Sequence, residues 1–181
     1  HVSLSTFIPK PHTPFQWAAC NNAEEIRLKQ GLIRRGLHDA NFKLTWTAPE
    51  ETILEASLSR GDRRLSDVIY IAWKCGTRFD AWRDQFNPSI WQAAFDQAGL
   101  SSEFYAHRVR SEDEIFPWDH INIGVRKNYL LQDYRWSLKA RARPDCRQHC
   151  YSCGVLTTFN HLRQGSPAEV WICPPISNEE E

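Results

Sequence analysis

The chain has 181 residues and carries 22 Lys and Arg against 22 Asp and Glu, so its formal net charge is zero. This length allows one sizeable hydrophobic core, or one core with a small appended module, and excludes a peptide that needs cross-links to fold. Zero net charge excludes strong attraction of nucleic acid by the molecule as a whole, which leaves only local patches for that role.

The chain opens with a predicted β-strand that ends in a rigid loop. Residues 2–8 alternate apolar and small polar side chains, which is typical of a strand with one buried face. Pro9, Pro11 and Pro14 then exclude both a helix and a central strand. A stiff loop at the end of a strand is a common place for ligand contacts.

A helix and a second strand follow. Asn22, with Glu25 three residues later, predicts a capping box that opens a helix whose apolar periodicity fades near Gly36. Residues 42–46, FKLTW, alternate again and predict a short strand. The predicted order is therefore strand, helix, strand.

Three further helices are predicted before residue 100. The first is capped by Thr47 and ends at Gly61 in the left-handed conformation, the second ends at Gly76, and the third begins at Asn87. Their apolar stripes are expected to form a core. The side chains in these stripes are Ile53, Leu54, Leu58, Leu65, Val68, Ile69, Ala72, Trp73, Ile90, Trp91, Ala94, Phe95 and Ala98.

The rest of the chain divides into a connection, a helix and a tail. Residues 107–117 are polar and predict a surface connection, and a helix is predicted from about Arg126 to Lys139. The side chains expected on its buried face are Leu130, Leu131, Tyr134 and Leu138. From Arg141 on there is little periodicity, so we expect a loop-rich tail that a metal or a partner organises.

Three cysteines of this tail, Cys146, Cys150 and Cys153, form a C-x3-C-x2-C pattern. Closely spaced thiolates suit an iron–sulfur cluster or a zinc ion, because both take soft anionic ligands. Cys20 and Cys75 stand alone, so the cysteine distribution does not favour a disulfide framework. The candidates for a fourth ligand are His149, His161 and Cys173.

The ends and the hydropathy of the chain predict where in the cell the protein is located and whether it is part of a longer chain. It contains no Met, it lacks the pattern of a signal peptide, and it has no run of about eighteen apolar residues. We therefore expect a cytoplasmic protein without membrane contact, and a chain that is a segment, a processed product or a truncated reading frame.

Several long motifs carry a resemblance to a known family. The segments STFIPKPHTPFQW, LSRGDRRLSDVIYIAWKCGTRFDAW, PWDHINIGVRKNYLLQDY and PDCRQHCYSCGV occur in this order between Val2 and Val155. Together they resemble the C-terminal half of a family of bacterial radical S-adenosylmethionine proteins that carry an N-terminal cobalamin-binding-type domain. The resemblance implies that a partner of this segment is the N-terminal part of the parent enzyme, which is not in this chain.

The resemblance implies an α/β fold class in three parts. Residues 1–47 would be the last strand–helix units of a partial (β/α)6 barrel, residues 48–140 a mainly helical extension, and residues 141–181 a Cys-rich metal-binding loop. The parent would cleave S-adenosylmethionine reductively at a [4Fe–4S] cluster, with cobalamin as a further candidate cofactor. We expect the isolated segment to be inactive.

The cysteine triplet has the spacing that binds the catalytic cluster in such enzymes, but its position differs. Only 28 residues, 154–181, follow Cys153, which is too few to complete a barrel. Ser152 also holds the place of the aromatic residue usual in that motif. The triplet is therefore predicted to bind an auxiliary cluster or a structural zinc ion.

Two groups of residues are candidates for cofactor contact and for catalysis. By the resemblance, the proline-rich loop lies on the barrel rim, where its side chains could touch S-adenosylmethionine or substrate. These side chains are Lys10, His12, Thr13 and Gln16. Asp119 could orient His120 for proton transfer. The alternative for each residue is an ordinary role in stabilising a loop or a turn.

A second hypothesis is a non-catalytic zinc-knuckle module that binds RNA or a protein partner. Residues 126–149 contain seven Lys and Arg against two Asp, and RGDRR at 60–64 suggests phosphate binding. A charge run is more often a solvated face. Metal content and salt-dependent RNA binding would separate the two hypotheses.

Overall fold

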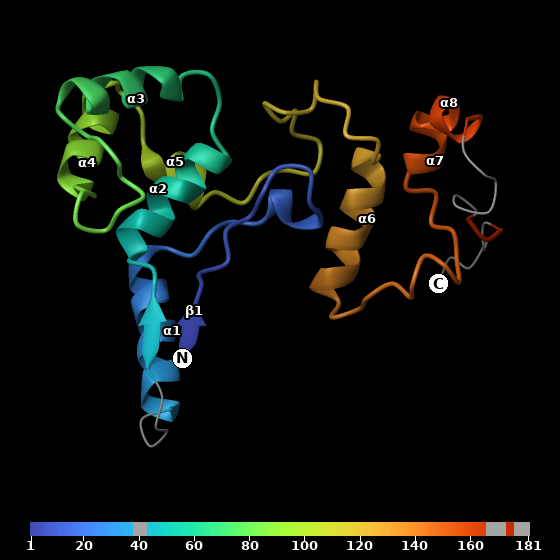
Figure 1. The fold of residues 1–181 in the computed structure, drawn as a ribbon, viewed down its shortest axis with the longest axis horizontal. Helices are drawn as coiled ribbons and strands as arrows, with labels where there is room; N and C mark the ends of the chain where they lie inside the picture. Colours follow the sequence, from blue (N-terminus) through green and yellow to red (C-terminus); the bar gives the residue numbers. More distant parts are fainter. Residues whose placement is uncertain (38–42, 166–172, 176–181) are drawn as a thin grey trace. The chain divides into compact units, whose positions relative to one another are not determined.

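The computed structural model describes residues 1–37, 43–165 and 173–175, which are mainly helical. They form two compact units, each of which takes chain from two separate stretches (Figure 1). Unit 1 comprises His1–Pro11 and Ala18–Ser111, and unit 2 comprises His12–Trp17 and Glu112–Glu181.

Unit 1 begins with the predicted strand–helix–strand order. Strand β1 (Val2–Leu4) pairs in parallel with β2 (Leu44–Trp46), and α1 (Ala23–Gly36) lies between them in sequence. Both strands are short, and Phe42 of the second predicted strand lies outside the described residues. The two-stranded sheet has the parallel pairing of a strand–helix–strand unit, and the barrel itself stays a prediction.

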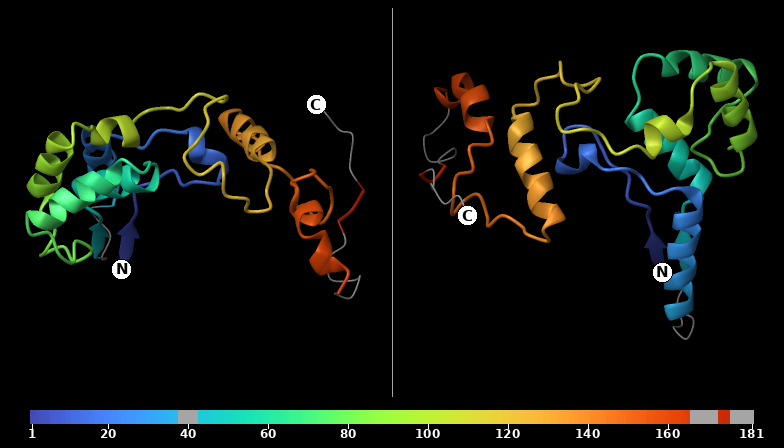
Figure 2. Two further views of the ribbon diagram at one scale, coloured as in Figure 1. Left: turned by 90° about the horizontal axis from the view of Figure 1, so that it is seen from above. Right: turned by 180° about the vertical axis from the view of Figure 1, so that it is seen from behind.

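Helix α1 starts where the sequence predicted. The Asn22 side chain accepts from the Glu25 backbone N–H at 2.9 Å, and the Glu25 carboxylate accepts from the Asn22 N–H at 2.9 Å, so the capping box is confirmed. The helix buries Ile26 but leaves Leu28 and Leu32 exposed. Figure 2 shows the same elements from above and from behind, with β1 beside its pairing partner β2.

Four helices build the core of unit 1: α2 (Pro49–Ser59), α3 (Leu65–Lys74), α4 (Pro88–Gln97) and α5 (Ser102–Ala106). The buried side chains of this core are Leu65, Val68, Ala72, Trp91, Ala94, Phe95 and Tyr105. The predicted stripe of α3 was too wide, because Ile69 and Trp73 are exposed, Trp73 by 51%.

The ends of these helices confirm part of the predicted capping. Asn87 caps α4 through the Ser89 N–H at 3.1 Å, and Gly76 has a φ of +100°. For α2 the cap is Ala48 rather than Thr47, and Gly61 is not among the residues of positive φ.

Unit 2 contains the 3-10 helix η1 (Pro14–Trp17), α6 (Lys127–Leu138) and two single-turn helices, α7 (Val155–Thr158) and α8 (Asn160–Arg163). Trp17 stacks on Tyr134 with ring centroids 5.8 Å apart, and it packs on Phe116 at 5.5 Å. Helix α6 was predicted correctly, but Leu138 is 68% exposed rather than buried. None of the described helices is long and apolar enough to cross a membrane.

Candidate metal centre

Three of the predicted metal ligands line one cavity in unit 2. Cys150, Cys153 and Cys173 border a space of about 500 Å³, together with Arg126 and Pro174. Cys173 lies 20 positions after Cys153 in the sequence, so the fold of the tail brings it back to the triplet. Of the three candidates for a fourth ligand, Cys173 is the one that the structure places at this cavity.

The pKa of Cys173 shows that all four thiols of the tail are electrostatic neighbours. Desolvation raises this pKa above its usual value, and the thiols of Cys150, Cys153 and Cys146 raise it further. The contribution of Cys150 includes a side-chain hydrogen bond as well as a charge. Cys146 does not line the cavity, but its charge acts on Cys173 in the same direction.

A tight turn holds two of these thiols in place. Ser152 and Gly154, on either side of Cys153, have φ values of +53° and +102°, so the chain reverses sharply there. A Cβ atom on Gly154 would lie 2.7 Å from Arg126 Cγ. The Arg126 N–H donates to the Cys153 carbonyl at 2.8 Å, which ties the turn to the start of α6.

The donor set fits a thiophilic metal by its chemistry. Four Cys suit a structural zinc ion or a [4Fe–4S] cluster. Within the described part of the chain, no three Cys, His, Asp or Glu side chains are already arranged to hold one metal ion. Binding would therefore require Cys146 and the three cavity thiols to move closer together.

The structure gives Arg143 a role inside unit 2. Its side chain is largely buried and forms an ion pair with Asp133. Its guanidinium carbon lies 5.0 Å from the ring centroids of Tyr129 and Trp136, and 4.6 Å from that of Tyr151. This arginine links α6 to the residue that follows Cys150 in the sequence. RNA binding by the basic stretch stays a prediction, but Arg143 is engaged within the unit.

The RGDRR motif is also engaged within its own unit. Arg60 is 1% exposed, and its guanidinium donates to the carbonyls of Tyr105 at 2.8 Å and Arg108 at 2.7 Å. Arg64 forms an ion pair with Asp62 at 2.7 Å. The motif therefore stabilises the end of α2 and the chain after α5, a role that the sequence analysis missed.

Lys10 of the proline-rich loop is anchored to α2. Its ammonium donates to the Glu55 carboxylate at 2.6 Å and to the Ser59 hydroxyl at 2.9 Å. These contacts lie within unit 1 and favour the loop-stabilising role. Contact of Lys10 with S-adenosylmethionine stays a prediction.

The other three loop residues belong to unit 2. Gln16 is 2% exposed, and its side-chain oxygen accepts from Trp118 Nε1 at 2.8 Å and from the His12 N–H at 3.2 Å. The Gln16 N–H donates to the Thr13 carbonyl at 3.1 Å. Gln16 thus acts as a bridge that fixes the loop to the segment around Trp118.

Asp119 and His120 do not form a carboxylate–imidazole pair. The Asp119 carboxylate accepts from the Phe116 N–H at 2.9 Å and forms an ion pair with Lys127. The His120 side chain is exposed and makes no hydrogen bond to another described residue. The geometry favours the turn role for Asp119, and catalysis by this pair stays a prediction.

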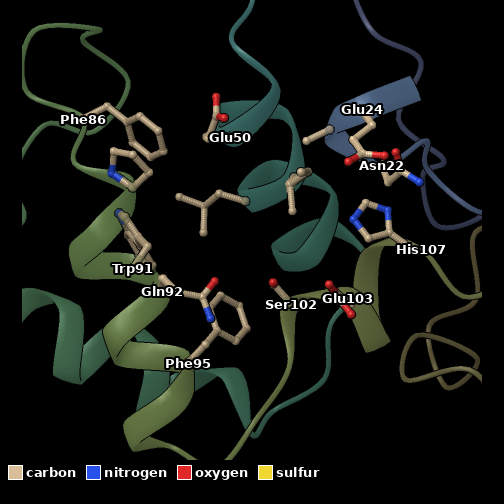
Figure 3. A pocket seen from close by; sticks show the side chains of 14 residues that line it. Asn22, Glu24, Glu50, Phe86, Trp91, Gln92, Phe95, Ser102, Glu103 and His107 are labelled. Atoms are coloured by element: carbon tan, nitrogen blue, oxygen red, sulfur yellow. The ribbon is translucent and has the colours of Figure 1, made fainter. Parts of the chain in front are cut away.

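A second cavity, of about 440 Å³, lies in unit 1 among residues of α1, α2, α4 and α5 (Figure 3). Its lining includes Glu24, Glu50, Trp91, Phe95 and Glu103. No sequence motif indicated it, because the residues come from four separate helices and share no spacing.

Comparison with known proteins assigns no family to the chain. A scan of protein-family models, a search of curated proteins and a search of solved structures each found no match.

Proposed function

We propose that the tail of unit 2 binds one metal centre through Cys146, Cys150, Cys153 and Cys173. The centre is an auxiliary [4Fe–4S] cluster or a structural zinc ion. The chain is then part of a radical S-adenosylmethionine enzyme, to which it contributes the rim of the barrel and this metal site. The observation that carries the proposal is the position of Cys173, which lines one cavity with Cys150 and Cys153.

The electrostatics of the tail favour a bound cation. Thiolates that lie close together repel one another, so each raises the pKa of its neighbours, as Cys150 does for Cys173. A metal ion removes this repulsion, because the thiolate is the form that binds the metal. All six cysteines are free thiols in the structure, so no disulfide competes for them.

The start of unit 1 supports the enzyme part of the proposal. Its β1–α1–β2 order with parallel pairing is the repeating unit of α/β barrels. A two-stranded sheet is marginal by itself. Leu28 and Leu32 of α1 expose apolar surface that further strands or helices could cover. The metal centre and this strand–helix–strand unit are both features that the proposed enzyme requires.

Metal analysis tests the proposal. The chain would be purified anaerobically, and iron, acid-labile sulfide and zinc would be measured per chain. About four iron and four sulfide indicate the cluster, and about one zinc indicates a structural zinc ion, which would also fit a non-catalytic zinc-knuckle module.

Single variants make the test specific to the tail. Cys150→Ala and Cys173→Ala should each lower metal content strongly. Cys75→Ala is the matched control, because Cys75 is an exposed cysteine of unit 1. Absence of both metals from the anaerobic protein, or equal loss in the control, would show that the tail holds no such centre.

A further inference from the structure

The cavity of unit 1 has an aromatic side. Figure 3 shows Phe86, Trp91 and Phe95 on one side of the space. Trp91 is 8% exposed, and its indole N–H donates to the Asp80 carboxylate at 3.2 Å. Because burial and this bond fix the indole, the aromatic side is formed without any ligand. Aromatic faces attract cations through their quadrupoles.

Three acidic residues also line the cavity. Glu24, Glu50 and Glu103 are the acidic residues of the lining, and each belongs to the first turn of its helix. Glu50 forms an ion pair with Arg27. Glu24 and Glu103 make no ion pair with another described residue. Two carboxylates at the cavity therefore keep their charge available to a ligand.

His107 adds a polar group to the same lining. Its Nδ1 lies 3.0 Å from the Cys20 carbonyl oxygen, which can only accept a hydrogen bond. Nδ1 must then carry a proton, and in the neutral ring Nε2 is an acceptor. The ring thus offers no N–H donor to a ligand in its neutral form.

The helix N-termini at the cavity do not cancel the attraction of its carboxylates for a cation. The helices α1, α2, α4 and α5 all begin there, and a helix N-terminus carries about half a positive charge. Two of the four are already capped by a side chain, α1 by Asn22 and α4 by Asn87. The two uncapped N-termini together carry about one positive charge, less than the negative charge of the two carboxylates of Glu24 and Glu103, so the cavity favours a cation over an anion.

We propose that this cavity binds a small organic cation with an apolar body. The apolar body packs against Phe86, Trp91 and Phe95, and the ammonium group lies toward Glu24 and Glu103. The volume of about 440 Å³ falls within the range of small-molecule sites. The site belongs to unit 1 and does not depend on the metal centre of unit 2.

The test uses three probes with one phenyl skeleton and different charge. These are 2-phenylethylamine as the cation, 2-phenylethanol as its neutral counterpart and phenylacetate as the anion. Calorimetric titration into the full chain should give binding of the amine at least about tenfold tighter than that of the alcohol. Phenylacetate should bind more weakly than both.

Two variants separate the parts of the site. The double variant Glu24→Gln/Glu103→Gln should reduce affinity for the amine to that for the alcohol, while Phe86→Leu should weaken both. Glu51→Gln is the matched control, because Glu51 also lies in the first turn of a helix, α2, but does not line the cavity. Circular dichroism would confirm that each variant is folded.

The outcomes that overturn the proposal are distinct. Equal binding of amine and alcohol would mean an apolar cavity without charge selectivity. Tighter binding of phenylacetate would mean an anion site at the helix N-termini. No binding of any probe at millimolar concentration, or an equal loss of amine binding in Glu51→Gln, would also overturn it. None of these outcomes bears on the metal content of the tail.

Discussion

The two units are stabilised in different ways. Unit 1 has a core of packed apolar side chains from α3, α4 and α5, with the guanidinium of Arg60 bound to backbone carbonyls beside it. Unit 2 has an aromatic cluster around Trp17 and α6. Beyond Tyr134, the described residues include no fully buried apolar side chain.

This difference shows why the tail needs another source of stability. Burial of apolar surface is the main favourable contribution to folding, and residues 141–165 have little of it. Small segments of this kind are commonly stabilised by a metal. The predictions below test whether packing supports unit 1 and metal supports the tail.

The largest effect is expected from removal of the metal. Structural zinc in small domains binds with about 10–16 kcal/mol, which is then the folding free energy of the segment. Chelation should therefore abolish amide protection in residues 141–165, as measured by hydrogen exchange. Unit 1 supplies the internal control, because its core contains no proposed ligand. Unchanged amide protection in the tail after complete metal removal would show that the metal does not stabilise the tail.

The next largest effect is expected from Arg60→Met in unit 1. The change leaves the buried carbonyl of Tyr105 and the partly buried carbonyl of Arg108 without their donor, so we expect a loss of about 3–5 kcal/mol in the free energy of unfolding. Urea denaturation measures it. Arg63→Met is the control, because Arg63 is exposed, and it should change stability by less than about 0.5 kcal/mol. Similar losses in both variants would show that the Arg60 contacts contribute little.

The helices show where sequence reasoning succeeds and where it fails. Local signals were sufficient for Asn22 and Glu25, because both partners of a capping box lie within one turn. Periodicity located α3 and α6, but it could not tell that Trp73 and Leu138 are exposed, since that depends on which other elements cover them.

The candidate sites show the same limit. The thiol pattern of Cys150 and Cys153 was visible in the sequence, and Cys173 was named among three possible fourth ligands. The bond from Trp118 to Gln16 joins residues 102 positions apart, and no local pattern encodes it. The cavity of unit 1 was missed for the same reason.

A glycine in unit 2 provides the third test. Gly124 has a φ of +82°, and a Cβ there would lie 2.4 Å from the ring of Phe159. Gly124→Ala should therefore destabilise unit 2 by about 2–3 kcal/mol, from left-handed strain and the displaced ring. Hydrogen exchange of α6 and of residues 154–159 measures the effect. Gly36→Ala is the control, since a Cβ at Gly36 meets nothing within 4 Å. A neutral Gly124→Ala would mean that Phe159 does not pack against Gly124 and that residue 124 does not need the left-handed conformation.

A smaller effect is expected from Trp118→Phe, which removes one hydrogen bond of unit 2. The side-chain oxygen of Gln16 would lose the donor that lies 2.8 Å away, and it would stay buried. We expect this to lower the free energy of unfolding of unit 2 by about 1–2 kcal/mol. Exchange of the α6 amides again reports it. Trp82→Phe makes the same chemical change at an exposed position and should be nearly neutral. Equal effects of the two changes would show that the hydrogen bond from Trp118 to Gln16 does not stabilise unit 2.

The smallest effect is a pH dependence in unit 1 from the buried thiol of Cys20. Burial raises its pKa above the usual 9.0, although the charge of Arg60 opposes the shift. The thiol donates to the Phe7 carbonyl at 3.7 Å, a bond that ionisation removes. The unfolded chain therefore loses this proton first as pH rises, so the stabilisation is complete below pH 9 and declines above it.

Comparison with Cys20→Ala isolates this contribution. The difference in unfolding free energy between the natural chain and the variant should be constant from pH 7 to about 8.5 and should shrink by pH 10. Subtraction cancels the other groups that titrate in this range, including Tyr105, whose pKa burial also raises. A difference that stays constant up to pH 10 would mean that Cys20 ionises as easily in the folded unit as in the unfolded chain. The packing that distinguishes unit 1 from the tail would then not extend to this thiol.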